Sequence, residues 1–138
     1  MVLLSATTLV SAQTLTGKWK TIDDENPGRV KSIVEITEQD GKYYGTVVEL
    51  FRLPDEDQDP HCDKCSDDRK DKPVLGLEII RGAKKADGKD VWEGGKILDP
   101  ENGRNYTLRM TPVEGGKKLE VRGYLGPFYR NQQWIRVE

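Results

Sequence analysis

Alternation of apolar and polar residues is the strongest pattern along this chain. Between residues 28 and 39, the apolar or small residues at even positions from Val30 to Ile36 fall on one face, because successive side chains of a strand point to opposite sides. The same period of two returns in 104–111 and in 117–126. The pattern predicts half-buried strands.

Glycine-containing turns separate these segments at short intervals. Dipeptides such as Asp40-Gly41 and Asn102-Gly103 form tight turns between antiparallel strands. The segment 74–82 has a mixed apolar pattern that fits either a strand or a short helix. We expect the other strands over 16–23, 28–39, 42–53, 89–99, 104–111, 117–126 and 129–138.

The predicted strands follow one another without a long helix between them. An antiparallel meander of about eight strands tends to close into an up-and-down barrel, because closure removes exposed edges. The predicted fold is therefore all-β, an up-and-down antiparallel barrel of about eight strands, with 74–82 as the place for one short helix. The interior of such a barrel is filled by side chains or holds one small ligand.

Composition restricts the partners of this barrel. The chain has 138 residues with 22 basic and 24 acidic side chains, which gives a net charge of -2. The two signs are interspersed, so no basic stripe indicates nucleic-acid binding. No apolar run approaches the roughly 20 residues of a membrane-spanning helix.

The first residues predict export. Residues 1–12 are apolar or small and end in Val10-Ser11-Ala12, a pattern that suits signal peptidase. The segment is short and has no positive charge at its start, so we interpret it as a truncated signal peptide. The mature protein would then be a single domain, residues 13–138, in the periplasm or outside the cell.

Residues 54–73 form an acidic segment that is expected to be a solvent-exposed loop, and it holds both cysteines. In an exported protein, Cys62 and Cys65 are expected to form a disulfide. A zinc site is an alternative, but with His61 the pair offers only three of four ligands. A redox centre is another, although nearby carboxylates disfavour the thiolate that it needs.

Candidate catalytic groups have simpler explanations. Asp23-Asp24 and Asp99-x-Glu101 are carboxylate pairs, but both lie at predicted strand ends or turns, and nothing positions a substrate between them. With one histidine and no nucleophile elbow, a serine triad has no support. We expect no catalytic residue, no metal and no cofactor.

Short motifs occur in a characteristic order from residue 17 to residue 136. Gly17-x-Trp19 begins the series, Cys62-x-x-Cys65 lies in the acidic loop, and Trp134-x-Arg136 ends it. The complete set is Gly17-x-Trp19-x-Thr21-x-Asp23-Asp24, Cys62-x-x-Cys65, Pro73-x-x-Gly76, Gly95-x-Ile97-x-Asp99-Pro100-x-x-Gly103-x-x-Tyr106, Leu119-x-Val121-Arg122-Gly123-Tyr124-x-Gly126 and Trp134-x-Arg136.

This series resembles a bacterial family of small exported proteins, catalogued as domain of unknown function 2147, and covers nearly the whole domain. The first and last motifs are also similar to those of lipocalin-like barrels. That resemblance implies that Trp19 closes one barrel end and that Arg136 stacks over it, a cation–π contact. The resemblance to the bacterial family implies a lipocalin-like barrel and an exported location, but no activity.

Three hypotheses for function follow. The first is a binding protein without catalytic activity, whose Trp19, Tyr106, Trp134 and Arg136 hold a small apolar or amphipathic ligand near the barrel mouth. The second is a protein-interaction module of the cell envelope that uses the acidic loop 54–73. The third is a thiol-redox or metal-binding protein that acts through Cys62 and Cys65.

Overall fold

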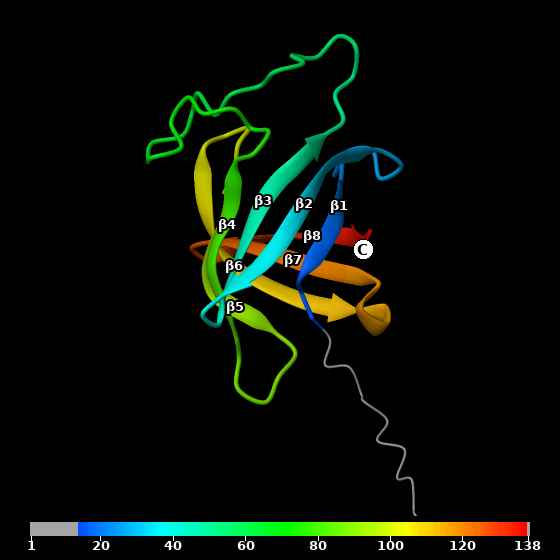
Figure 1. The fold of residues 1–138 in the computed structure, drawn as a ribbon, viewed down its shortest axis with the longest axis vertical. Coiled ribbons are helices and arrows are strands. Elements are labelled where there is room, and N and C mark those ends of the chain that lie inside the picture. Colours follow the sequence, from blue (N-terminus) through cyan, green and yellow to red (C-terminus); the bar gives the residue numbers. More distant parts are fainter. Residues whose placement is uncertain (1–13, 138) are drawn as a thin grey trace, which may run out of the picture.

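The structure is a computed structural model that describes residues 14–137, so the predicted signal peptide lies outside the described residues. Eight antiparallel strands form a closed barrel, and each strand pairs with the next one in the sequence (Figure 1). The predicted up-and-down barrel is confirmed. The strands are β1 Gly17–Ile22, β2 Val30–Gln39, β3 Lys42–Leu50, β4 Glu78–Lys85, β5 Trp92–Asp99, β6 Arg104–Val113, β7 Lys118–Leu125 and β8 Phe128–Arg136.

The ambiguous segment 74–82 leads into a strand, so the alternative of a short helix there was wrong. Its Ile80 pairs with Gly45 of β3 on one side and with Ile97 of β5 on the other. Between residues 14 and 137 the one helix is η1, a 3-10 turn at Glu114–Gly116. No helix in this part of the chain is long and apolar enough to span a membrane.

The core lies inside the barrel, as the alternating pattern predicts. Val34 and Ile36 of β2 are buried, and so are Leu119 and Val121 of β7. Leu125 follows the same period but is exposed, because it lies next to the hairpin turn at the end of β7. The largest fully buried side chains are Trp19, Trp92, Trp134, Leu15, Ile36, Ile80, Leu108, Met110 and Leu119.

One end of the barrel is closed by Trp19 and Arg136. The guanidinium carbon of Arg136 lies 4.2 Å from the ring centroid of Trp19, so the stacking implied by the family resemblance is present. The Trp19 indole donates to the Leu15 carbonyl at 3.0 Å. Arg136 also donates to the carbonyl oxygens of Gly116, Thr16 and Thr14.

The opposite end carries the long connections. Since the strands alternate in direction, the links 23–29, 51–77, 100–103 and 126–127 all lie at this end. In Figure 1 the link between β3 and β4 arches over the barrel and is much longer than the other turns. We call this the open end.

Candidate functional site: a cavity at the open end

A cavity of about 830 Å³ enters the barrel from the open end. This volume lies within the range of about 300–1,000 Å³ that is usual for small-molecule sites. Apolar side chains from four strands line its deeper part, among them Val47, Ile97, Val121 and Trp134. The barrel is therefore hollow at one end and packed at the other.

A glycine makes room for one aromatic wall of this cavity. A Cβ at Gly123 would lie 3.1 Å from the Cβ of Tyr106, which is tighter than ordinary side-chain contact. Both residues line the cavity. The Tyr106 hydroxyl accepts a hydrogen bond of 2.9 Å from the Asn102 amide at the open end, so the ring spans from core to rim.

Charged residues surround the cavity mouth and are paired with one another. Arg29 contacts Asp23 at 3.2 Å and Glu56 at 2.5 Å, which joins the link 23–29 to the link 51–77. Lys31 contacts Glu101 at 2.7 Å, from β2 to the turn before β6. The rim is thus polar, and ion pairs join several of its charged side chains across the mouth.

Local hydrogen bonds keep two of these carboxylates ionised. The backbone N–H of Glu25, with further help from that of Asn26 and from Arg29, holds the pKa of Asp23 below its ordinary value. The backbone N–H of Leu53, followed by the Arg29 guanidinium, does the same to the pKa of Glu56. Both carboxylates therefore stay ionised in more acidic solution than ordinary carboxyl groups do.

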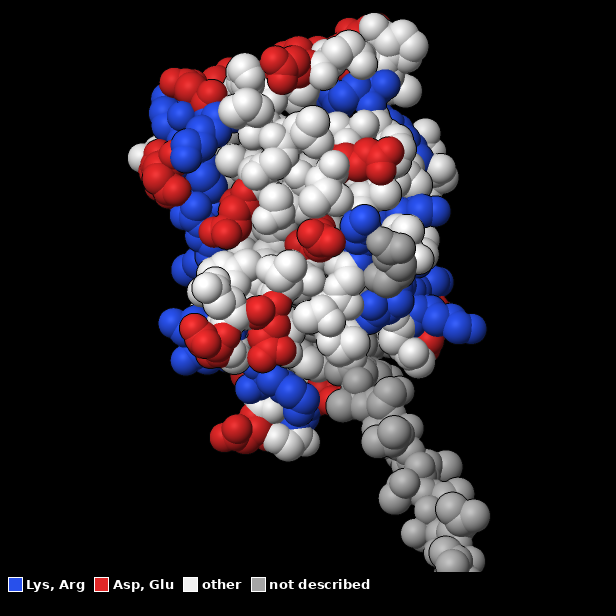
Figure 2. Space-filling model, in the orientation of Figure 1, with Lys and Arg blue, Asp and Glu red and all other residues white. Residues whose placement is uncertain are grey.

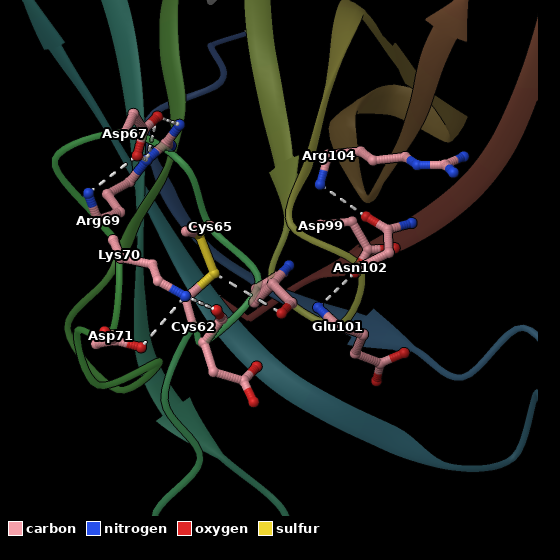
Figure 3. The surroundings of a disulfide bond; sticks show 12 residues. Cys62, Cys65, Asp67, Arg69, Lys70, Asp71, Asp99, Glu101, Asn102 and Arg104 are labelled. Atoms are coloured by element: carbon pink, nitrogen blue, oxygen red, sulfur yellow. Dashed lines mark hydrogen bonds and ion pairs between the residues drawn. A yellow bond between two sulfur atoms is a disulfide. The ribbon is translucent and has the colours of Figure 1, made fainter.

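The disulfide loop, defined here as residues 61–73, forms one wall of the mouth. Cys62 and Cys65 are joined with an S–S distance of 1.98 Å and a Cα–Cα distance of 5.4 Å (Figure 3). The expected disulfide is present. His61 and Pro73 form a short antiparallel bridge at the base of the loop.

The expectation that this whole segment is solvent-exposed was wrong. Cys62 and Cys65 are buried and belong to the hydrophobic core. The Cys62 sulfur lies 3.8 Å from the Pro100 carbonyl oxygen, and Figure 3 shows the disulfide against the turn 99–103. The loop bears few apolar residues, but its two sulfurs supply the apolar contact that the sequence pattern did not show.

Gly103 allows this close contact. Its φ is +74°, and a Cβ there would collide with the backbone carbonyl of Lys64. The turn after β5 therefore accepts the disulfide loop directly against its backbone. A glycine that the sequence analysis read as turn punctuation also determines where the loop lies.

Arg69 is the polar anchor of the disulfide loop. It is buried, and its guanidinium donates to the Glu78 carbonyl at 2.9 Å and to the Asn105 side-chain oxygen at 3.0 Å. It also contacts Asp67 at 2.5 Å, and these contacts hold the pKa of the Asp67 carboxyl well below its usual range. Arg69 thus attaches the loop to the beginnings of β4 and β6.

The four residues predicted to hold a ligand lie in two places. Tyr106 and Trp134 line the cavity. Trp19 is fully buried and, with Arg136, closes the other end of the barrel. The structure therefore brings Tyr106 and Trp134 together as candidate ligand contacts, and it gives Trp19 and Arg136 a closing role away from the cavity lining.

Sequence reasoning missed the polar half of the cavity wall on β8. Arg130 and Gln132 line the cavity beside Trp134. Their positions could have been found, because residues two and four positions before an inward Trp134 point to the same side of a strand. Ser32 and Thr21 were also missed, and their hydroxyl groups lie 2.6 Å apart in the wall.

Several of the motifs that carry the family resemblance meet at this cavity. Asp23 and Asp24 lie at its rim, Tyr106 and Trp134 lie deeper, and Asp99 comes from the turn beside the disulfide loop. These segments are far apart in the sequence. The cavity is therefore the place where the distinctive residues of the chain converge.

The third hypothesis relied on thiols or a metal. Both cysteines are engaged in the disulfide and buried. In the part of the chain that the structure describes, no group of three or more His, Cys, Asp and Glu side chains is placed to hold a metal ion. Neither a reactive thiolate nor a metal centre is built here from these residues.

The closed eight-stranded up-and-down barrel, with a cavity at its open end, is a lipocalin-like fold. Residues 17–136 match the family of uncharacterised proteins conserved in bacteria, domain of unknown function 2147, and the chain belongs to that family. No curated protein matches the chain. Among solved structures it is similar to HP1028 from the human pathogen Helicobacter pylori, described as a lipocalin-family protein, with a TM-score of 0.73 and 21% identity over 92% of this chain and 85% of that one.

Proposed function

We propose that this protein is a binding protein without catalytic activity, which holds one small apolar or amphipathic molecule in the open-end cavity. The observation that carries the proposal is the cavity itself, about 830 Å³ in volume, with an apolar interior under a paired, charged rim. An apolar body would lie against Val121 and Trp134, and a polar group would stay at the rim.

The proposal places the protein in the periplasm or outside the cell. It is supported by the signal-like residues 1–12 and by the bonding distance between Cys62 and Cys65. Disulfides persist in oxidising compartments and are rare in the bacterial cytosol. Figure 2 shows acidic and basic side chains interspersed over the face of the molecule that it draws. This agrees with a protein that does not bind nucleic acid.

The envelope-interaction module is the weaker candidate. It would use the acidic segment 54–73 as a contact surface and would best suit a barrel whose interior is filled. The barrel instead has a cavity, and part of the acidic segment lines it, including Pro60, Asp63 and Lys64. The segment therefore belongs to the wall of the proposed ligand site.

A substitution that fills part of the cavity should weaken ligand binding. We expect Val121→Phe to weaken binding of the neutral apolar dye phenylnaphthylamine by about ten-fold or more, which corresponds to at least about 1.4 kcal/mol. Val121 is buried and lines the cavity, so the larger ring takes space that the dye needs. Dye fluorescence on titration measures the affinity.

The matched control makes the same change outside the barrel. Val48 on β3 is 39% exposed, so Val48→Phe should leave dye affinity unchanged. Equal loss of affinity in both variants would show that the dye binds the surface or an unfolded form. Equal affinity in Val121→Phe and the unchanged protein would contradict the proposal.

A further inference from the structure

The barrel is closed by a short ladder where its first and last strands meet. β1 pairs with β8 at only two positions, Trp19 with Arg136 and Lys20 with Ile135. On its other edge β8 pairs with β7 from Phe128 to Ile135. Within residues 14–137, the β1-facing edge of β8 from Phe128 to Trp134 therefore has no strand partner. We call this gap, between 21–24 and 128–134, the seam.

The cavity reaches the seam from inside. Thr21 and Asp24 on the β1 side line the cavity, and so do Arg130 and Gln132 on the β8 side. Both lips of the gap are thus part of the cavity wall. No backbone ladder has to break for a small molecule to pass between them.

One carboxylate bridges the two lips. The Asp24 Oδ2 atom lies 3.1 Å from the Arg130 guanidinium and accepts a hydrogen bond of 3.2 Å from the Gln132 amide. The Asp24 and Arg130 side chains are 44% and 62% exposed. Contacts between such exposed groups are weak and exchange readily with water. We call Asp24, Arg130 and Gln132 the latch.

The latch is connected to the cavity interior. The Gln132 side-chain oxygen accepts a hydrogen bond of 3.2 Å from the Trp134 indole N–H. Trp134 is buried, with 1% of its surface exposed, and it lines the cavity. Movement of Gln132 would therefore change the surroundings of the Trp134 indole.

The route over the top of the cavity is held more firmly than the seam. The disulfide loop is packed on the turn 99–103, and Arg69 attaches it to the barrel. Arg29 also joins two links there through Asp23 and Glu56, and these three side chains are less exposed than those of the Asp24–Arg130 pair. Between 21–24 and 128–134, in contrast, the latch supplies the polar side-chain contacts across the seam, and these contacts are exposed.

From these observations we infer that the ligand enters and leaves the cavity sideways, through the seam between β1 and β8, and that Asp24 controls the rate. The inference rests on the proposed function, because it assigns a path to the same cavity. Phe128 and Tyr129, which are exposed on β8 at the outer part of the seam, would provide an apolar approach. The polar side chains of the latch slow the passage of the ligand, but they are not part of the apolar surface that binds it.

The test is a stopped-flow measurement of phenylnaphthylamine binding. Asp24→Ala should raise both the association and the dissociation rate by about three-fold, because it removes an exposed ion pair that closes the path. High salt should raise the rates of the unchanged protein toward those of Asp24→Ala and leave the variant nearly unaffected, because salt screens the pair.

Two further variants separate the competing explanations. Asp90→Ala, at the opposite end of the barrel, changes net charge equally and should leave the rates unchanged. Glu101→Ala opens the ion pair across the mouth and should change the rates less than Asp24→Ala. If Glu101→Ala accelerates binding and Asp24→Ala does not, the path lies over the top and the inference is wrong.

The emission of Trp134 gives a second, independent readout. In Asp24→Ala without dye, loss of the Gln132 contact should shift the fluorescence of Trp134, with the Trp134→Phe variant identifying its share of the spectrum. No dye binding to the unchanged protein would defeat the proposed function itself. Dye binding with rates that Asp24→Ala does not alter would defeat only the seam.

Discussion

Replacing Arg69 by alanine should release the disulfide loop from the barrel and lower the free energy of unfolding by about 3 kcal/mol. The side chain is buried, and its loss would leave the Glu78 carbonyl and the Asn105 amide oxygen without their donor. Asp67 would also lose its ion-pair partner, but its side chain is partly exposed, so water can solvate the carboxylate. Urea unfolding measures the total effect, and hydrogen exchange at the Cys62 and Asp71 amides reports on the loop.

Arg81→Ala is the matched control for Arg69→Ala. Arg81 pairs with Asp68 and Glu78 at 2.9 and 2.6 Å, but these side chains are a third or more exposed. We expect a loss of at most about 1 kcal/mol, as for other surface pairs. Equal losses in the two variants would mean that burial of Arg69 does not anchor the loop.

The ion pair between Arg69 and Asp67 should also make stability depend on pH in acid. Arg69 holds the pKa of Asp67 well below its ordinary value of 3.8, so the folded state binds a proton less readily than the unfolded state. Its contribution to stability is therefore complete above about pH 5 and declines as the pH falls below 4. In Arg69→Ala this part of the acid dependence should disappear.

Arg136→Ala should produce a loss of similar size, about 2–4 kcal/mol, at the closed end. The variant loses a cation–π contact of about 0.5–2 kcal/mol with Trp19 and leaves three carbonyl oxygens without their donor. The near-ultraviolet circular dichroism of Trp19 should weaken, because its ring would lose its fixed cover. Urea unfolding gives the energy.

Arg136→Lys distinguishes shape from charge at this end. An ammonium group keeps the charge but cannot present a planar fork to Gly116, Thr16 and Thr14 together. We expect lysine to recover less than half of the loss. Full recovery would mean that charge alone closes the barrel.

The sequence predicts the barrel well because a strand repeats every two residues. Val34 and Ile36 have the burial that alternation implies, whereas Val30 and Ser32 are only partly buried. The last strand needed only small changes at its ends. The segment 74–82 was ambiguous because its pattern lacks a clear period. Pairing of Ile80 with Gly45 and Ile97, which is a tertiary effect, decides that a strand forms.

The site was harder to predict, because its residues meet only through the closed barrel. Tyr106 and Trp134 were identified as aromatic candidates, but no local pattern says at which end of a barrel a side chain lies. Trp19 and Arg136 were placed at the mouth for this reason. The burial of Arg69 had no signal in a charged segment, since it depends on acceptors from β4 and β6.

Native mass spectrometry of the protein, isolated without detergent from the organism that makes it, tests most directly whether the cavity holds a ligand. We predict a bound mass of a few hundred daltons, as the volume of about 830 Å³ allows, which is lost on denaturation and is absent from Val121→Phe but present in Val48→Phe. A bound mass that is retained equally in both variants would contradict the account, and so would a protein that carries nothing and also fails to bind phenylnaphthylamine.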